Sequence, residues 1–197
     1  MSGPSKTQKI VRTPEQINEI RKCAADVVYF AENYAWIPHP IEGLIRFKPY
    51  PYQKEALRAF QDEQFIIVNK SRQLGFSTVT MVYSLWLALF HRNKNIVSLA
   101  TKLATAQNYI SRLRESLKKI PDWLFLTEFA SYSKKEISFT NGSIIRAVPT
   151  SESSNRGDSL SVLVLDECVD GSTQISIRNK EPLKEYQVTI QDFFEMI

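Results

Sequence analysis

The sequence has few of the features that would place it in a membrane, outside the cell or around a metal ion. No apolar run reaches the roughly 18 residues of a membrane-spanning helix, and the polar start lacks the hydrophobic core of a signal peptide. The only two cysteines, Cys23 and Cys168, lie far apart, which argues against a disulfide framework or a cysteine metal site. The 197 residues are 43% hydrophobic and 23% charged. We therefore expect a cytoplasmic protein with one main domain and a short appendage.

The formal net charge of +4 is unevenly distributed along the chain. Residues 168–197 contain three basic and five acidic residues, a net charge of −2, which leaves +6 on the preceding residues. A basic body fits a polyanionic partner such as nucleic acid or nucleotide, but an ordinary solvated surface explains the same charge equally well. Charge therefore does not decide the function.

The first part of the chain predicts a helix followed by an irregular arm. The segment Thr13-Pro14-Glu15-Gln16 has an N-cap threonine, a proline at the first helical position and a glutamine that closes a capping box. Cys23 lies beside the apolar face of this helix and is expected to be a small core or boundary residue. Residues 36–51 are rich in proline and aromatics, have no clear period and are expected to be a connecting arm. The apolar residues at helical spacing are Ile17, Ile20, Ala24 and Val27.

From residue 65 onward, strands and helices are expected to alternate. An apolar strand at 65–68 precedes a long apolar helix at about 77–90, and a second strand at 96–100 precedes another helix. This order implies a parallel sheet with helices on its faces. The second helix carries its apolar residues at Ile110, Leu113, Leu117 and Ile120.

Two further strand features follow the second helix. Residues 136–148 predict a hairpin that turns at Asn141-Gly142, the strongest short turn signal in the chain. The short uninterrupted apolar run at 162–165 is typical of a buried parallel strand, and it places Asp166 and Glu167 at a strand end. The expected fold is therefore α/β, a P-loop NTPase-type, mainly parallel sheet with flanking helices.

A candidate phosphate loop lies between the first strand and its helix. Helix N-terminal amides and the helix dipole favour negative charge at such a position. Compared with the standard pattern of a P-loop, Gly75 and Ser77 fit, but Lys70 replaces the first glycine and Phe76 replaces the lysine. A structural turn with Ser77 as a helix cap explains the loop alone equally well. The candidate loop comprises Lys70, Ser71, Arg72, Gln73, Leu74, Gly75, Phe76, Ser77 and Thr78.

The acidic pair at the end of the last apolar strand favours nucleotide chemistry. Asp166 at this position can hold Mg²⁺, and Glu167 can orient or deprotonate the attacking water. Taken alone, the pair is equally well a solvated strand terminus. The loop and the pair together, in this order on alternating elements, favour a P-loop ATPase.

Four segments together resemble the large terminase subunit of tailed phages, the motor that packages DNA into proheads. The resemblance covers approximately residues 25–167. It implies that Gln53 recognises adenine, that Ser77 and Asp166 bind Mg²⁺, and that Glu167 is the catalytic glutamate. The matching segments are Tyr52-Gln53, Ser71 to Gly75, Arg156 to Ser159 and Leu165 to Glu167.

Basic residues near the loop are candidates for contacting phosphate. Some large terminases resemble this sequence in carrying the loop lysine at the front, where Lys70 stands, and a lysine from either side can supply charge to the phosphates. Arg72 is a further candidate. Arg156 resembles the family's arginine finger, which acts on a neighbouring subunit, and a loop salt bridge is an equally good explanation for it.

The sequence loses its terminase character at Cys168, where it begins to resemble the first block of inteins. A splicing intein needs a nucleophile at its first position, and a cysteine thiolate suits that role because it attacks the preceding carbonyl, here that of Glu167. The chain's only histidines, His39 and His91, lie in the terminase-like part. The histidines that splicing requires would then come from another polypeptide, as in a split intein.

Alternatives remain open for the last thirty residues and for the whole chain. Residues 168–197 can be the N-terminal, β-rich fragment of a split intein, a truncated contiguous intein, or an extension whose Cys168 only packs behind a strand. Strand structure is expected at 185–190 and the start of a helix at 191–197. The whole chain can be half of a terminase, a helicase-like P-loop ATPase with a simple extension, or a binding-only remnant.

The leading interpretation has three segments and two layers of function. Residues 1–60 form an N-terminal helix and arm, residues 61–167 an incomplete P-loop core, and residues 168–197 the intein fragment. Splicing in trans would join the chain to a C-terminal half, and the product would use ATP and Mg²⁺ to move DNA. We expect poor ATP hydrolysis before ligation. The resemblance implies as partners double-stranded DNA, the portal protein, the small terminase subunit and other large-subunit copies in a ring, in the host cytoplasm and without a membrane.

Overall fold

The computed structural model describes residues 11–71, 73–100, 102–149 and 159–165, together with the backbone of two strands at 174–179 and 184–189. Among the described residues, no helix has both the length and the apolar content needed to cross a membrane. The helices are α1 (Pro14–Ala25), α2 (Val27–Tyr34), α3 (Pro51–Asp62), α4 (Phe76–Phe90) and α5 (Leu103–Leu117), with a short 3-10 helix η1 (Asp122–Leu124).

The strands form three separate sheets. Two of these are antiparallel pairs, β1 with β2 and β8 with β9, and the third has five strands in the order β4-β5-β6-β3-β7. The strands are β1 (Trp36–His39), β2 (Gly43–Arg46), β3 (Asn95–Ala100), β4 (Phe129–Tyr132), β5 (Glu136–Phe139), β6 (Ile144–Pro149), β7 (Val162–Leu165), β8 (Gln174–Asn179) and β9 (Lys184–Thr189).

The five-stranded sheet is mixed, so the expected mainly parallel sheet needs correction. Strand β3 pairs in parallel with β6 on one side and with β7 on the other. The pairs β4-β5 and β5-β6 are antiparallel, and the second of them is the hairpin predicted at Asn141-Gly142, which returns the chain directly beside itself. Gly142 has a φ of +83°, a backbone conformation that glycine adopts without steric cost. The hairpin was predicted correctly, but it adds antiparallel edge strands to a parallel centre.

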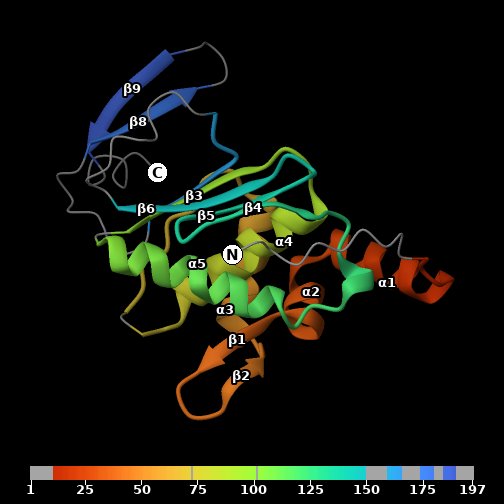
Figure 1. Cartoon of the computed structure of the whole chain (residues 1–197). Coiled ribbons are helices and arrows are strands. Elements are labelled where there is room, and N and C mark those ends of the chain that lie inside the picture. The colour runs from red at the N-terminus through yellow and green to blue at the C-terminus, as the bar shows by residue number, and fades with distance from the viewer. Residues whose placement is uncertain are drawn as a thin grey trace.

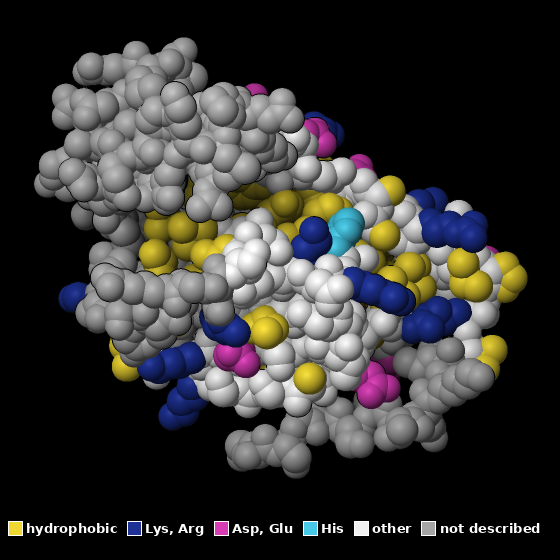
Figure 2. Space-filling view, turned by 90° about the horizontal axis from the view of Figure 1, so that it is seen from above, with side chains coloured by type: hydrophobic (Ala, Val, Ile, Leu, Met, Phe, Trp, Pro, Cys, Tyr) yellow, Lys and Arg dark blue, Asp and Glu magenta, His cyan; other side chains and the backbone are white. Residues whose placement is uncertain are grey.

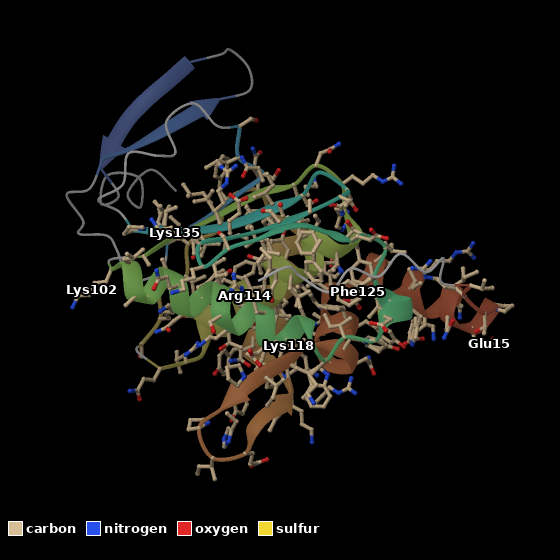
Figure 3. The ribbon with its side chains drawn as sticks, viewed as in Figure 1. Glu15, Lys102, Arg114, Lys118, Phe125 and Lys135 are labelled. Atoms are coloured by element: carbon tan, nitrogen blue, oxygen red, sulfur yellow. The ribbon has the colours of Figure 1, made fainter. Side chains whose placement is uncertain are left out.

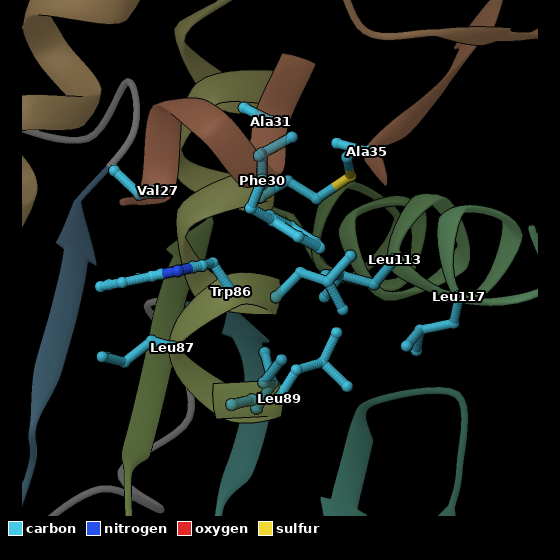
Figure 4. Packing of buried hydrophobic residues seen from close by; sticks show 14 of the residues in the cluster. Val27, Phe30, Ala31, Ala35, Trp86, Leu87, Leu89, Leu113 and Leu117 are labelled. Atoms are coloured by element: carbon cyan, nitrogen blue, oxygen red, sulfur yellow. The ribbon is translucent and has the colours of Figure 1, made fainter. Parts of the chain in front are cut away.

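One face of the sheet is covered by helices, with α4 at the centre of the core (Figure 1). Helix α4 is apolar on almost every side and buries nine of its residues. Such a helix is stable only when other elements surround it. Figure 4 shows Trp86, Leu87 and Leu89 of α4 among side chains from α2 and α5, including Phe30 and Leu113.

Helix α1 begins as the sequence predicts. The Thr13 hydroxyl accepts a hydrogen bond from the Gln16 amide, and the Gln16 side chain accepts one from the Thr13 amide, which completes the capping box. Arg12, just before the cap, donates to the carbonyls of Trp123 and Phe125 at 2.7 and 2.5 Å. The start of the chain's described part is therefore fixed to η1 and the residue after it (Phe125 is labelled in Figure 3).

Side chains complete the hydrogen bonding at the junction of α1 and α2. The Cys23 carbonyl lies in the last turn of α1, where helix carbonyls lack a partner further along the helix. It accepts a buried hydrogen bond of 2.7 Å from the Trp86 indole of α4. Gln61 of α3 accepts from the Val27 amide and donates to the Ala25 carbonyl. Both α3 and α4 are thus joined to the chain's first two helices.

The irregular arm predicted at 36–51 contains a small hairpin that the sequence did not indicate. Strand β1 pairs antiparallel with β2 around Gly43, which has a φ of +76°. The Trp36 ring lies under the Arg46 guanidinium at 5.0 Å. Pro38 interrupts any clear alternation, so a pattern of period two could not reveal these strands.

The strand predicted at Phe65–Val68 is absent. These residues have no regular structure, and Phe65 and Ile67 are 67% and 44% exposed. The helix that follows them leads to β3, but β3 already has β6 and β7 on its two sides. Apolar and β-branched residues form a strand only where a neighbour accepts their main-chain hydrogen bonds. Within the described part of the chain, these residues pair with no strand.

Strand β7 occupies the expected position but is less buried than predicted. It pairs with β3 alone and so forms an edge within the described part of the chain. Val162 packs against the helical core, so Leu163 and Leu165 point to the opposite face, where they are 49% and 42% exposed. Figure 2, which looks at the molecule from above, shows hydrophobic side chains gathered on this side.

The last two strands agree in part with the expected β-rich segment. Strands β8 and β9 pair antiparallel, with Gln174 opposite Thr189 and Asn179 opposite Lys184. Strand β9 covers most of the strand expected at 185–190. The helix start expected at 191–197 lies outside the described residues.

Trp86→Phe tests the connection between α4 and α1. The substitution removes the donor to the Cys23 carbonyl and leaves a buried acceptor unpaired, which should lower the free energy of unfolding by about 1–3 kcal/mol. Trp36→Phe, at a half-buried indole on β1, is the matched control and should cost less. Urea unfolding of both variants measures the difference, and an equal loss in both would contradict the role of this hydrogen bond.

Candidate nucleotide site

The candidate phosphate loop turns sharply into α4 at Gly75. Gly75 is the N-cap of α4 and has left-handed backbone angles, φ 72° and ψ 18°. Its carbonyl accepts the first helical hydrogen bonds, from the amides of Thr78 and Val79 at 3.0 and 3.1 Å. Gln73 also has a positive φ, 64°, which is uncommon for a residue other than glycine. The loop therefore contains two residues with left-handed backbone angles and leads directly into the N-terminus of α4.

Ser77 does not cap α4, although the sequence left this explanation open. The cap position belongs to Gly75, and Ser77 lies in the first turn with its carbonyl accepting from the Thr80 hydroxyl. Its hydroxyl is thus on the helix end that faces the loop, half-buried beside Thr78. First-turn hydroxyls are suited to a metal ion held next to a phosphate.

Gln53 connects the start of α3 to this loop. Its side chain is only 4% exposed. The amide nitrogen donates to the Leu74 carbonyl at 3.0 Å, and the amide oxygen accepts from the Tyr50 amide at 3.0 Å. The Tyr52 hydroxyl donates to the same Leu74 carbonyl at 3.1 Å. Two neighbouring side chains of α3 therefore hold one carbonyl of the loop.

The close fit explains why glycine stands at position 75. A Cβ there would lie 2.9 Å from the Gln53 amide nitrogen, which is too close, and the positive φ would strain any other residue.

An aromatic stack that the sequence analysis missed lies beside the loop. The rings of Tyr50 and Tyr52 are almost parallel, at 7°, with centroids 5.7 Å apart, and Tyr52 is also stacked on Phe76 at 6.2 Å. Tyr50 at the outer end is 63% exposed and Tyr52 38%. The close spacing of Tyr50 and Tyr52 in the sequence was the available signal. Their contact with Phe76, however, depends on how α3 packs against α4.

The structure brings together some of the predicted site residues. Gln53, Leu74, Gly75 and Phe76 are in contact or adjacent, and Ser77 and Thr78 follow in the first turn of α4. Lys70 is half-buried and Ser71 exposed, before the turn. The remaining predicted residues, Arg72, Arg156, Asp166, Glu167 and Cys168, lie outside the described residues.

The acidic pair follows the carboxyl end of a parallel strand. Strand β7 ends at Leu165, which pairs with Leu99 near the carboxyl end of β3. In open α/β sheets, ligands bind outside the carboxyl ends of parallel strands. Of the two predicted magnesium ligands, only Ser77 lies within the described residues. Within them, no group of three or more histidine, cysteine or acidic residues lies together. A carboxylate such as that of Asp166 would have to complete a metal site.

Cys23 is a structural residue, as the sequence predicts. Its side chain is fully buried between the first helices. Burial, with a smaller contribution from Glu19, raises the pKa of the Cys23 thiol to about 12. A thiol with such a pKa is protonated at neutral pH and is a poor nucleophile.

Comparison with known proteins supports the fold. No family model matches the chain. The chain is similar to the crystal structure of the HK97 bacteriophage large terminase, with a TM-score of 0.58 and 19% sequence identity, over 73% of this chain and 31% of that one. The chain therefore has a terminase-like α/β fold and spans about a third of the length of that terminase.

Gly75→Ala tests the fit between the loop and Gln53. The variant should lose about 1–2 kcal/mol of stability from backbone strain at positive φ. It should lose about 1 kcal/mol more because the new methyl group displaces the buried Gln53 amide. Gly43→Ala is the matched control, since Gly43 has a similar φ but no atom within 4 Å of the new Cβ. Thermal unfolding of both variants measures the difference. Equal destabilisation would mean that Gln53 can move away from the new methyl group without loss of stability.

Proposed function

We propose that this chain is the N-terminal ATPase part of a phage terminase large subunit, which becomes active after it is joined to a C-terminal half. The observation that carries the proposal is the loop of left-handed Gly75 at the N-terminus of the buried helix α4, within a terminase-like fold. This loop presents helix amides and the positive end of the helix dipole, which favour a bound triphosphate.

Each predicted site residue has a proposed role in ATP hydrolysis. Lys70 neutralises charge on the phosphates from the front of the loop, and Arg72 assists it. The Ser77 hydroxyl and the Asp166 carboxylate bind Mg²⁺, which supplies positive charge to the transferred phosphate. Glu167 orients and deprotonates the attacking water, and Arg156 contacts the phosphate bound to a neighbouring subunit.

The uncovered parts of the sheet support a requirement for a further polypeptide. Strand β7 has an unpaired edge among the described residues, and the apolar segment Phe65–Val68, which leads into the loop, has no strand neighbour. A C-terminal half that adds a strand at β7 would pair with this edge. ATP hydrolysis by the isolated chain would then be poor, because the loop would rest on an unsupported segment.

The proposed organisation has three parts. Residues 1–60 form the N-terminal helices and arm, residues 61–167 the incomplete P-loop core and residues 168–197 the N-terminal fragment of a split intein. The antiparallel pair of β8 and β9 is in keeping with a β-rich fragment, although such a pair is common to many folds.

Splicing would begin with an acyl shift at Cys168. The Cys168 sulfur attacks the Glu167 carbonyl carbon, a C–S bond forms and the C–N bond of the peptide breaks. The thiol proton ends on the freed amino group, so the products are a thioester and an amine. A C-terminal intein fragment on a second polypeptide supplies the histidines and the nucleophile that completes the ligation.

The ligated product would act as a DNA-packaging motor. Its partners are double-stranded DNA, the portal protein, the small terminase subunit and other copies of the large subunit in a ring, all in the host cytoplasm. The basic charge of the terminase-like part suits contact with DNA phosphates.

Lys70→Ala tests the displaced phosphate lysine. In the ligated product, this change should lower the ATP turnover rate by about 100-fold, because a charge that stabilises the transferred phosphate is lost. Phe76→Ala, at the standard lysine position, should lower the rate by less than about 10-fold, because this residue offers no charge. A coupled assay of phosphate release measures both variants. Small and equal effects would assign the phosphate charge to another residue.

Cys168→Ala tests the splicing step. With a cognate C-terminal half present, the variant should give no ligated product and should still associate with that half, because only one sulfur atom is removed. An added thiol should release residues 1–167 from the wild type and not from the variant. The control Cys23→Ala removes the other cysteine and should leave ligation intact, because Cys23 is buried and protonated. Mass spectrometry detects each product, and ligation by Cys168→Ala at the wild-type rate would refute the intein assignment.

A further inference from the structure

Positive charge is concentrated on the side of α5 that faces away from the core. Residues 102–119 contain five basic residues and one acidic residue, so their net charge, 5 − 1, is +4, equal to that of the whole chain. Ile110, Leu113 and Leu117 are buried in the core, which places the charged side chains on the outer side of the helix. The basic residues are Lys102, Arg112, Arg114, Lys118 and Lys119.

Two further lysines lie beside α5, on the turn between β4 and β5. Arg114 donates a hydrogen bond to the Ser133 carbonyl, and its guanidinium lies over the Tyr132 ring, 4.1 Å from the centroid. The Lys135 amide donates to the Ser133 hydroxyl at 3.3 Å, which fixes the shape of the turn. Arg114 therefore holds the turn, and with it Lys134 and Lys135, against α5 (Figure 3 labels Arg114 and Lys135).

The aromatic rings next to this face are already covered by cations. Tyr132 lies under Arg114. Trp36 of β1 has Arg46 and Lys119 over its ring, at 5.0 and 5.8 Å from the centroid. Single-stranded nucleic acids bind largely by stacking their bases on aromatic rings, whereas the phosphates of a duplex are contacted by cations. The face therefore suits a duplex backbone better than unpaired bases.

The face is long enough to contact several phosphates. Lys102 and Lys118 are the two cap residues of α5. They lie about 24 Å apart at about 1.5 Å per residue, a length of about seven base pairs. The one acidic residue, Glu115, pairs with Lys118 at 2.6 Å. Arg112 and Lys134 are exposed and form no ion pair among the described residues, so their charges are available to a partner.

We propose that this basic face, formed by α5 and the β4-β5 turn, binds the phosphate backbone of double-stranded DNA without regard to sequence. Arg114 is a positioning residue that holds the two lysines of the turn in place. The inference rests on the proposed packaging function for the identity of the polyanion, and it adds that the chain binds DNA before ligation. All the residues of the face belong to this chain, so binding requires no C-terminal half.

Fluorescence anisotropy of the whole unligated chain with a labelled duplex tests the face. Arg112→Gln/Lys134→Gln should weaken binding about 10-fold and reduce the steepness of log affinity against log salt by about 2, because two phosphate contacts are lost. The matched control Arg21→Gln/Arg58→Gln removes two exposed charges from α1 and α3 and should bind like wild type. Duplexes of different sequence should bind equally, and a single strand of the same length more weakly.

Arg114→Lys separates the positioning role from charge. Lysine keeps the positive charge but lacks the planar guanidinium that lies on Tyr132 and donates to the turn. The variant should therefore bind the duplex several-fold more weakly at unchanged net charge. Unchanged affinity would overturn the positioning role. The exposed positions of Arg112 and Lys134 keep the face testable if Arg114→Lys fails to fold.

The outcomes separate this inference from the function on which it rests. Equal weakening by the two double variants would overturn the basic face, because binding would then follow net charge alone. Poly-L-glutamate that competes as well as unlabelled duplex would overturn it too, and would assign the face to an acidic protein. No duplex binding by wild type would defeat the inference, whereas the ATPase proposal is decided separately by turnover in the ligated product.

Discussion

The burial of α4 is the constraint on which the rest of the structure depends. A helix with apolar residues on almost every side has no surface to turn toward water, so α1, α2, α3, α5 and the sheet must surround it. This position also fixes the helix N-terminus at Gly75. The loop before α4 is therefore held by the core behind it and by α3 beside it, through Gln53 and Tyr52.

The features that the sequence predicts correctly are those whose causes are local. The Thr13 capping box, the extent of α4 and the turn at Asn141-Gly142 each depend on residues within a few positions of one another. The prediction of a strand at 65–68 was wrong, because a strand forms only when another strand pairs with it and a local sequence pattern does not show such pairing. The prediction that β7 is buried was wrong for the same reason: its residues have the composition of a central strand, but among the described residues β7 is an edge strand.

The features of the candidate site also fall into two groups, those with a local cause and those that depend on the packing of distant elements. The loop and its glycine could be found from residue spacing, since a helix start and a positive φ leave a sequence pattern. The aromatic stack could not, because Tyr52 and Phe76 come from different helices and meet only when α3 packs on α4. Gln53 shows a further limit. The resemblance implied that it recognises adenine, whereas its two hydrogen bonds to main-chain groups follow from the detailed path of α3 and could not be read from the sequence.

The edge of β7 that is unpaired among the described residues affects which polypeptides the chain associates with. Within the described part of the chain, one edge of β7 is unpaired and carries exposed apolar side chains, and such an edge can pair with another extended segment, including a second copy of itself. Self-association rises with the square of concentration in its earliest step, whereas capture by a different polypeptide rises with that polypeptide's abundance. A polypeptide that pairs with this edge therefore competes with self-association, and its abundance relative to the chain decides which of the two complexes forms.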